Sequence, residues 1–122
     1  MISASSSKGL TIVVWVLQVL TGCLFLFAGA SKLFGVAEMV NFFAQVGFGH
    51  WLRYFLGALE VGSAVTLFLP RQAFYGAVVL CVSLVGHIVM HAAVLHRPAA
   101  FLVFLLAVTS LIAYLRRPSA SA

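Results

Sequence analysis

The fold of this chain depends on how the stretch LQVLTGCLFLFAGASKLFG, residues 17–35, is interpreted. LTGC at 20–23 follows an apolar run as a lipoprotein processing box follows a signal peptide, and AGA at 28–30 is similar to a signal-peptidase site. However, LFLF at 24–27 continues the apolar run where a processed lipoprotein would carry a polar tether. The run is also longer than the roughly 7–15 residues of an ordinary signal sequence. We therefore predict that this stretch stays uncleaved and forms a membrane helix, with Lys32 near its far end.

The composition also predicts an integral membrane protein. The chain has 122 residues, of which 64% are hydrophobic and 7% are charged, and its mean hydropathy is +1.18. Typical globular chains are about 25% charged, so this chain lacks the polar surface of a small soluble domain. The net charge of +5 comes from basic residues scattered along the chain. Because they form no basic face, we expect no nucleic-acid partner, and the expected surroundings are a lipid bilayer.

Four apolar runs are long enough to form membrane-spanning helices, each of which needs about 20 residues. The runs are continuous and do not alternate, so they indicate helices and exclude a barrel. The predicted fold is all-α, an integral membrane four-helix bundle in one domain at residues 10–117, with disordered tails at 1–9 and 118–122. The predicted spans are about 10–34, 51–69, 72–95 and 99–115.

Between the first two spans, the segment VAEMVNFFAQVGFGHW at 36–51 has helical periodicity. Glu38, Asn41 and Gln45 share one helical face, opposite the apolar residues Met39, Val40, Phe43 and Val46. We predict a short amphipathic helix in the membrane interface that ends at Gly47 and Gly49, in preference to an irregular loop.

The distribution of basic residues predicts the orientation. Four spans place both termini on one side, which holds Lys8, Arg71, Arg116 and Arg117. The other side holds Lys32, Arg53 and Arg97. This small excess favours cytoplasmic termini, since basic loops stay in the cytoplasm. We expect a multi-pass protein of the bacterial inner (plasma) membrane.

Ionisable residues inside the predicted spans are candidate functional positions, because charge in hydrocarbon is costly. Glu60 lies about midway through the second span, and Arg53 lies seven residues earlier on the same helical face. Gln18 and Lys32 share a stripe on the first span, together with Gly29. These faces are therefore expected to point into the bundle.

The third span carries His87 and His91 on a face with small residues, which is typical of helix surfaces that pack against protein. At about 1.5 Å per residue, Gln18 and Glu60 are expected at a similar depth, roughly 12–14 Å from the side that holds the termini. The basic groups and histidines are expected in the outer half. We predict a polar pocket open toward the non-cytoplasmic side. Its candidate ligand-binding residues are Gln18, Lys32, Arg53, Tyr54, Glu60, His87 and His91.

Each of these residues also has a structural explanation. Glu60 can be a neutral carboxyl group or can pair with Arg53 or Lys32, and the histidines can hydrogen-bond across the bundle. The two histidines share one helical face, which argues against a two-histidine haem site, and two glutamates are too few for a di-iron site. No metal site is expected. Cys23 and Cys81 are far apart, without a CxxC motif, and are expected to act as small hydrophobic residues.

Four motifs in this order and spacing resemble the DoxX-like family over roughly residues 25–115: FAGASKLFG, LRYFLGALEVGSAVTLFLP, GHIVMH and YLRRP. The resemblance implies a four-helix membrane bundle with Lys32, Glu60 and His91 at the polar positions of the family. His87 stands where a small residue is expected. Members of the wider family are associated with quinone-linked sulfur oxidation, oxidative-stress membrane complexes and the assembly of other membrane proteins.

Two functions are compatible with these features. In the first, the protein is a small redox-associated subunit whose pocket binds a quinone or a similar apolar ligand. Lys32, Arg53 and the histidines would hydrogen-bond the head of that ligand, Glu60 would handle a proton, and aromatic residues such as Phe25 and Tyr54 would line the slot. In the second, it is a non-catalytic assembly or accessory factor for another membrane protein or complex, and the polar residues fix the register of the helices. The expected protein partner is a membrane complex or a further copy of the chain. No nucleophile–base pair or nucleotide loop is recognisable, so no catalytic residue is assigned.

Overall fold

The structure is a computed structural model that describes residues 4–47 and 50–118, and the regular elements in these ranges are all helical. The predicted all-α class is therefore confirmed. The predicted tail residues 1–3 and 119–122, and Gly49, lie outside the described residues. The elements are α1 (Ala4–Phe34), α2 (Ala37–Val46), α3 (His50–Thr66), α4 (Ala73–Val89), the π-helical turn η1 (Met90–Val94) and α5 (Ala100–Leu115).

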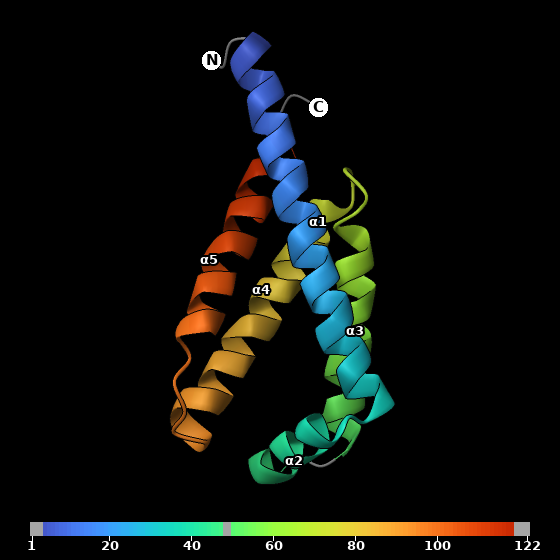
Figure 1. The fold of residues 1–122 in the computed structure, drawn as a ribbon, viewed down its shortest axis with the longest axis vertical. Coiled ribbons are helices and arrows are strands. Elements are labelled where there is room, and N and C mark those ends of the chain that lie inside the picture. The colour runs from blue at the N-terminus through green and yellow to red at the C-terminus, as the bar shows by residue number, and fades with distance from the viewer. Residues whose placement is uncertain (1–3, 48–49, 119–122) are drawn as a thin grey trace.

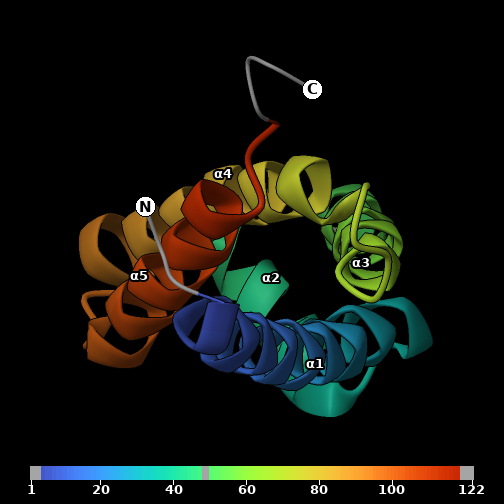
Figure 2. The same cartoon turned by 90° about the horizontal axis from the view of Figure 1, so that it is seen from above.

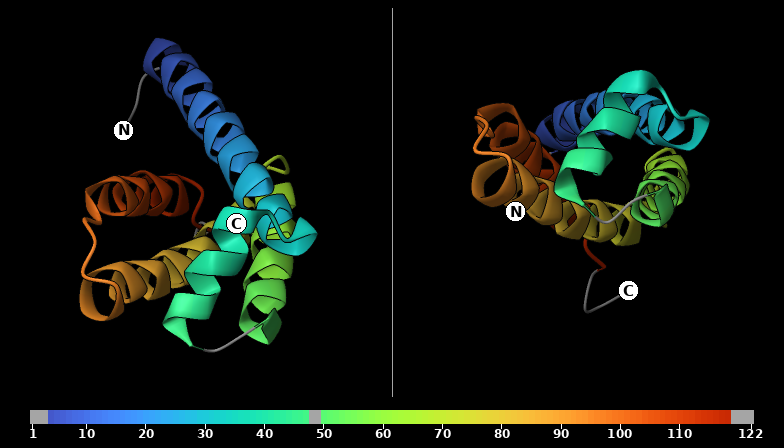
Figure 3. Two further views of the ribbon diagram at one scale, coloured as in Figure 1. Left: turned by 60° about the horizontal axis from the view of Figure 1, so that its bottom comes forward. Right: turned by 90° about the horizontal axis from the view of Figure 1, so that it is seen from below.

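The four long helices follow one another around a ring in the order α1, α3, α4 and α5 (Figure 2). The most extensive helix contacts join α1 to α3, α4 to α5 and α3 to α4, whereas α1 and α5 share few. The start of α1 and the end of α5 lie at the same end of the bundle, and these two helices diverge toward the other end (Figure 1). The short helix α2 lies across that other end (Figure 3).

Two glycines permit α1 and α3 to pack backbone against backbone. A Cβ atom added to Gly29 would lie 2.9 Å from the carbonyl oxygen of Gly57, and one added to Gly57 would lie 3.0 Å from the carbonyl oxygen of Gly29. Small residues allow this close approach in helix pairs. The contact of these glycines sets the register of α1 against α3, and in this register the long side chain of Lys32 reaches Glu60, with Nζ 2.9 Å from Oε1.

The predicted amphipathic helix between the first two long helices is confirmed as α2. Phe42 and Phe43 are buried, while Glu38, Asn41 and Gln45 are exposed. The helix ends at Gly47, which has a φ of 93°, and its N–H donates to the carbonyl oxygen of Phe43 at 3.1 Å. Glycine suits this left-handed position because it has no Cβ atom.

Two helical segments are long and apolar enough to cross a membrane, Lys8–Phe34 and Ala73–Val94, and the apolar helix α5 is shorter. Helix α1 begins at Ala4, before the start of the predicted first span at residue 10, and α3 ends at Thr66, before its predicted end at residue 69. Turns around Pro70 follow α3, consistent with the inability of proline to continue a helix. The third predicted span is a composite of α4 and η1.

Gln18 joins three parts of the bundle at the end where α1 and α5 meet. Its side chain is fully buried. The amide nitrogen donates to the carbonyl oxygen of Leu67 at 2.7 Å, and the amide oxygen accepts from Arg116 Nε at 2.6 Å. Gln18 therefore holds α1 to the segment after α3 and to the end of α5, and the structure places it away from the other candidate pocket residues.

We expect Gln18→Leu to lower the free energy of unfolding by about 1–3 kcal/mol for each polar group that loses its partner and stays buried. Gln72→Leu is the matched control, because Gln72 is exposed and its side chain caps no helix. Chemical unfolding in detergent micelles measures both. Equal stabilities of the two variants would contradict this role of Gln18.

Candidate functional site

A buried ion pair joins α1 to α3. Lys32 is 4% exposed and Glu60 is fully buried, and Lys32 Nζ lies 2.9 Å from Glu60 Oε1. Of the two partners expected for Glu60, the structure therefore selects Lys32. Each charge offsets the desolvation of the other, because an isolated buried charge is strongly unfavourable.

The second carboxylate oxygen of Glu60 faces α4. Ser83 Oγ donates to Glu60 Oε2 at 3.4 Å, and His87 Nε2 lies 3.4 Å from the same oxygen. Three helices thus meet at one carboxylate, and Ser83 takes part although no motif singled it out as a ligand. The cluster of Lys32, Glu60, Ser83 and His87 is called the polar cluster below.

The two histidines of the third span are oriented by backbone carbonyl groups. His87 Nδ1 lies 2.8 Å from the carbonyl oxygen of Ser83, and His91 Nδ1 lies 3.0 Å from that of His87. A carbonyl oxygen only accepts, so both Nδ1 atoms carry hydrogen and Nε2 is the atom left for other partners. His87 Nε2 is buried and makes no hydrogen bond of acceptable geometry within residues 4–47 and 50–118, despite its distance to Glu60.

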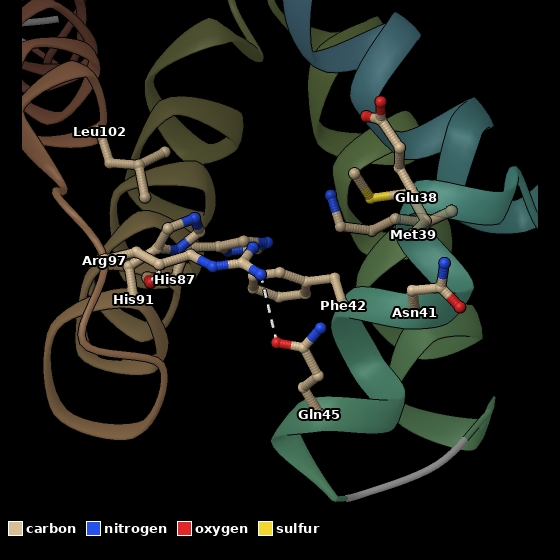
Figure 4. Close-up of a pocket in the computed structure, with 10 residues that line it drawn as sticks. Glu38, Met39, Asn41, Phe42, Gln45, His87, His91, Arg97 and Leu102 are labelled. Atoms are coloured by element: carbon tan, nitrogen blue, oxygen red, sulfur yellow. Dashed lines mark hydrogen bonds between the residues drawn. The ribbon is translucent and has the colours of Figure 1, made fainter.

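A cavity of about 510 Å³ adjoins the polar cluster. In Figure 4, His87, His91, Arg97 and Leu102 border it on one side, and residues of α2 border it on the other. Two contacts cross it: Arg97 Nη2 donates to Gln45 Oε1 at 3.2 Å, and the His91 ring lies 5.0 Å from the Phe42 ring. The cavity is lined by Lys32, Glu38, Met39, Asn41, Phe42, Gln45, His87, His91, Arg97 and Leu102.

A second cavity of about 140 Å³ also adjoins the polar cluster. It shares Lys32, His87 and Leu102 with the larger cavity, so the two adjoin each other at these side chains. Apart from the polar cluster, its walls are apolar. The lining residues are Leu24, Phe25, Ala28, Lys32, Glu60, Leu84, His87, Phe101, Leu102 and Leu105.

Comparison with known proteins assigns the family. The model of the DoxX-like family matches residues 16–113, which include the whole polar cluster and all the lining residues of both cavities. The chain belongs to the DoxX-like family. The resemblance seen in the sequence motifs is thereby confirmed.

A curated relative of this DoxX-like protein is "Putative oxidoreductase CatD" of Bacillus subtilis (strain 168), which is 28% identical over 83 residues. The aligned region covers 68% of this chain and 62% of the relative, so the chain spans less than two thirds of that protein's length. No solved structure matches the chain.

Arg53 and Tyr54 lie outside both cavities of the DoxX-like protein, in contrast to their predicted place in the pocket. Arg53 is buried and donates through Nη1 to the carbonyl oxygen of Lys32 near the end of α1. Its Nη2 lies 3.1 Å from His50 Nδ1, and its Cζ lies 4.4 Å from the centroid of the half-exposed Tyr54 ring. Arg53 thus neutralises the negative end of the α1 dipole and does not pair with Glu60.

Sequence reasoning missed the contribution of α2 and of the segment after η1 to the site. Asn41 and Gln45 were predicted on the polar face of an interfacial helix and were not named as site residues, yet they line the larger cavity with Arg97. The polar periodicity of α2 was the available signal, but it does not reveal which element the polar face meets. Within residues 4–47 and 50–118, the structure contains no group of three or more His, Cys, Asp or Glu side chains that could hold a metal ion. Cys23 and Cys81 are free thiols.

Proposed function

We propose that this DoxX-like protein is a multi-pass protein of the bacterial inner membrane, in which α1, α3, α4 with η1, and α5 form a membrane-spanning bundle. Large apolar side chains are exposed around the ring, among them Leu20, Phe27 and Val82, each at least 65% exposed. Large apolar side chains exposed on the outside of the bundle are suited to contact with lipid. Helix α2 would lie in the interface, and the shared end of α1 and α5 would face the cytoplasm (Figure 1).

We further propose that the cavities bind a quinone-like ligand, with its polar head beside the polar cluster. The observation that carries this proposal is His87 Nε2, which is buried without a hydrogen-bond partner among the described residues and lies where the two cavities adjoin. A buried polar atom of this kind favours a ligand that completes its hydrogen bonding. The volume of about 510 Å³ lies within the range of small-molecule sites.

The side chains of the polar cluster can hydrogen-bond both redox forms of a quinone head, the carbonyl groups of the quinone and the hydroxyl groups of the quinol. Neutral His87 would accept from a quinol hydroxyl through Nε2, and protonated His87 would donate to a quinone carbonyl. The Lys32 ammonium group has three hydrogens and gives one to Glu60, so it can also donate to the ligand. Glu60 would exchange a proton with His87, which lies 3.4 Å away.

A redox-associated role follows by analogy with the family and with the printed name of the Bacillus subtilis relative. The protein would hold the quinone as a subunit of a membrane complex, and another component would supply or remove electrons.

Quinone binding by the purified protein tests this proposal. In lipid nanodiscs, the wild type should bind a short-tailed benzoquinone, and His87→Asn should raise its Kd about tenfold or more, because a buried hydrogen bond to the head is lost. The matched control is His96→Asn, since His96 is exposed and has a φ of 53°, a conformation that asparagine tolerates. Calorimetric titration measures both.

The same preparation addresses the assembly-factor alternative. If the folded wild type binds no quinone and is recovered from native membranes in stoichiometric complex with one membrane protein, the ligand proposal is wrong and the accessory role is favoured. In that case His87→Asn would change recovery of the partner or the stability of the bundle.

A further inference from the structure

The smaller cavity, called the slot below, has the apolar lining expected of a site that binds the hydrocarbon tail of a ligand. Its walls away from the polar cluster are Leu24, Phe25 and Ala28 of α1, Leu84 of α4, and Phe101, Leu102 and Leu105 of α5. An apolar cavity of about 150 Å³ takes a benzene-sized hydrocarbon. The slot of about 140 Å³ can therefore hold the first segment of an alkyl or isoprenoid chain whose head lies beside Lys32 and His87.

The slot also reaches the outer face of the bundle. Helices α1 and α5 approach each other at the end that holds Gln18 and Arg116, and they diverge toward the slot (Figure 1). Phe101 forms part of the wall although it is 61% exposed, so this wall lies at the surface of the molecule. In a bilayer, the space between α1 and α5 would open sideways to hydrocarbon.

The larger cavity has a more polar lining than the smaller one. Seven of its lining side chains are charged, amide or imidazole groups, and the Arg97–Gln45 hydrogen bond crosses it. Burying an apolar chain against these groups would remove them from water without offering hydrogen bonds in return. The chemistry of the two cavities therefore assigns the head to the larger cavity and the tail to the smaller one.

We infer that the ligand is an amphiphile with a hydrogen-bonding head and a single apolar tail, and that it enters sideways from the bilayer between α1 and α5. The tail passes Ala28 and Phe101, and the head comes to rest against the polar cluster. This inference rests on the proposed function and extends it, because it names the tail as a determinant of specificity and Ala28 as the residue that leaves room for it.

Two quinones with the same head, one without a tail and one with a decyl tail, test the inference in nanodiscs. The wild type should bind the tailed quinone more tightly. Ala28→Trp fills the slot, so it should raise the Kd of the tailed quinone about tenfold or more and that of the tail-free quinone less than about twofold. Ala107→Trp is the matched control, since Ala107 is exposed on α5 and lines neither cavity.

A second variant keeps the test decisive if Ala28→Trp does not fold. Phe101→Ala removes an exposed side chain from the wall and should reduce the preference for the tailed quinone at least about threefold, with unchanged affinity for the tail-free quinone. Equal weakening of both quinones, or of neither, would overturn the inference. Equal wild-type affinity for the two quinones would overturn it while leaving the proposed function intact, whereas a wild type that binds neither would overturn the proposed function itself.

Discussion

Glu60→Gln is expected to lower the free energy of unfolding by about 3–5 kcal/mol, because it leaves the ammonium group of Lys32 buried without a counter-charge. Lys32 Nζ lies 2.9 Å from Glu60 Oε1, with the two side chains 5% and 0% exposed. Solvent therefore does not screen this pair as it screens an ion pair on a protein surface. Unfolding in detergent micelles, followed by helical circular dichroism, measures the loss.

A double-mutant cycle separates the ion pair from a general loss of packing. Lys32→Met alone should also destabilise the bundle, since Glu60 then lacks its cation. The double variant should be about 2–3 kcal/mol more stable than the sum of the two single losses implies, because apolar or neutral replacements of both partners remove the buried charge.

Glu38→Gln is the matched control for this cycle. Glu38 is exposed on α2 and forms none of the ion pairs found within the described residues. Its substitution should change the stability by less than about 0.5 kcal/mol. Purely additive losses for Glu60→Gln and Lys32→Met would show that the ion pair does not contribute as a unit.

Gly29→Leu should destabilise the bundle by about 3 kcal/mol or more and should also abolish ligand binding. A Cβ atom at this position would lie 2.7 Å from Val61 Cγ2 and 2.9 Å from the carbonyl oxygen of Gly57, so α1 and α3 must separate. Overpacking of this kind usually costs about 1–3 kcal/mol, and more where backbone must move. Separation of the two helices would also pull Lys32 away from Glu60.

Gly86→Leu provides the comparison, because a Cβ atom at Gly86 meets nothing within 4 Å. Leucine is a better helix former than glycine, so this control should leave the stability unchanged or raise it by up to about 1 kcal/mol. Thermal unfolding and quinone titration of the two variants form the test. Similar behaviour of Gly29→Leu and Gly86→Leu would refute the backbone contact between α1 and α3.

The elements themselves were largely predictable. Continuous apolar runs of this length predict helices, because in an apolar environment a helix satisfies all the backbone hydrogen bonds of a segment within that segment. This property does not depend on which other helix the segment packs against. The periodicity of Glu38, Asn41 and Gln45 predicted α2 for the same local reason. The errors at the helix ends were small, and they came from turns such as that around Pro70.

The partners of the polar residues were not predictable, because they depend on the register between helices. The depth estimate placed Gln18 beside Glu60, but α3 ends at Thr66 and Gln18 meets Leu67. Leu67 follows Glu60 by seven residues, a separation of about 10 Å along a helix, which is more than the reach of a glutamine side chain. Arg53 precedes Glu60 by seven residues and therefore lies toward the opposite end of α3, where it contacts the end of α1.

The sequence by itself determined the helical class, the family and the identity of the buried charges, because composition, motif order and the cost of charge in an apolar segment are properties of single segments. Tertiary structure alone decided that Lys32 is the partner of Glu60, that the polar face of α2 lines a cavity, and that α1 and α5 diverge around an apolar slot. For the ion pair, the physical reason is the close contact of Gly29 with Gly57, which sets the height of α1 against α3. For the two cavities, it is the packing of separate helices against one another, and no single helix contains that information.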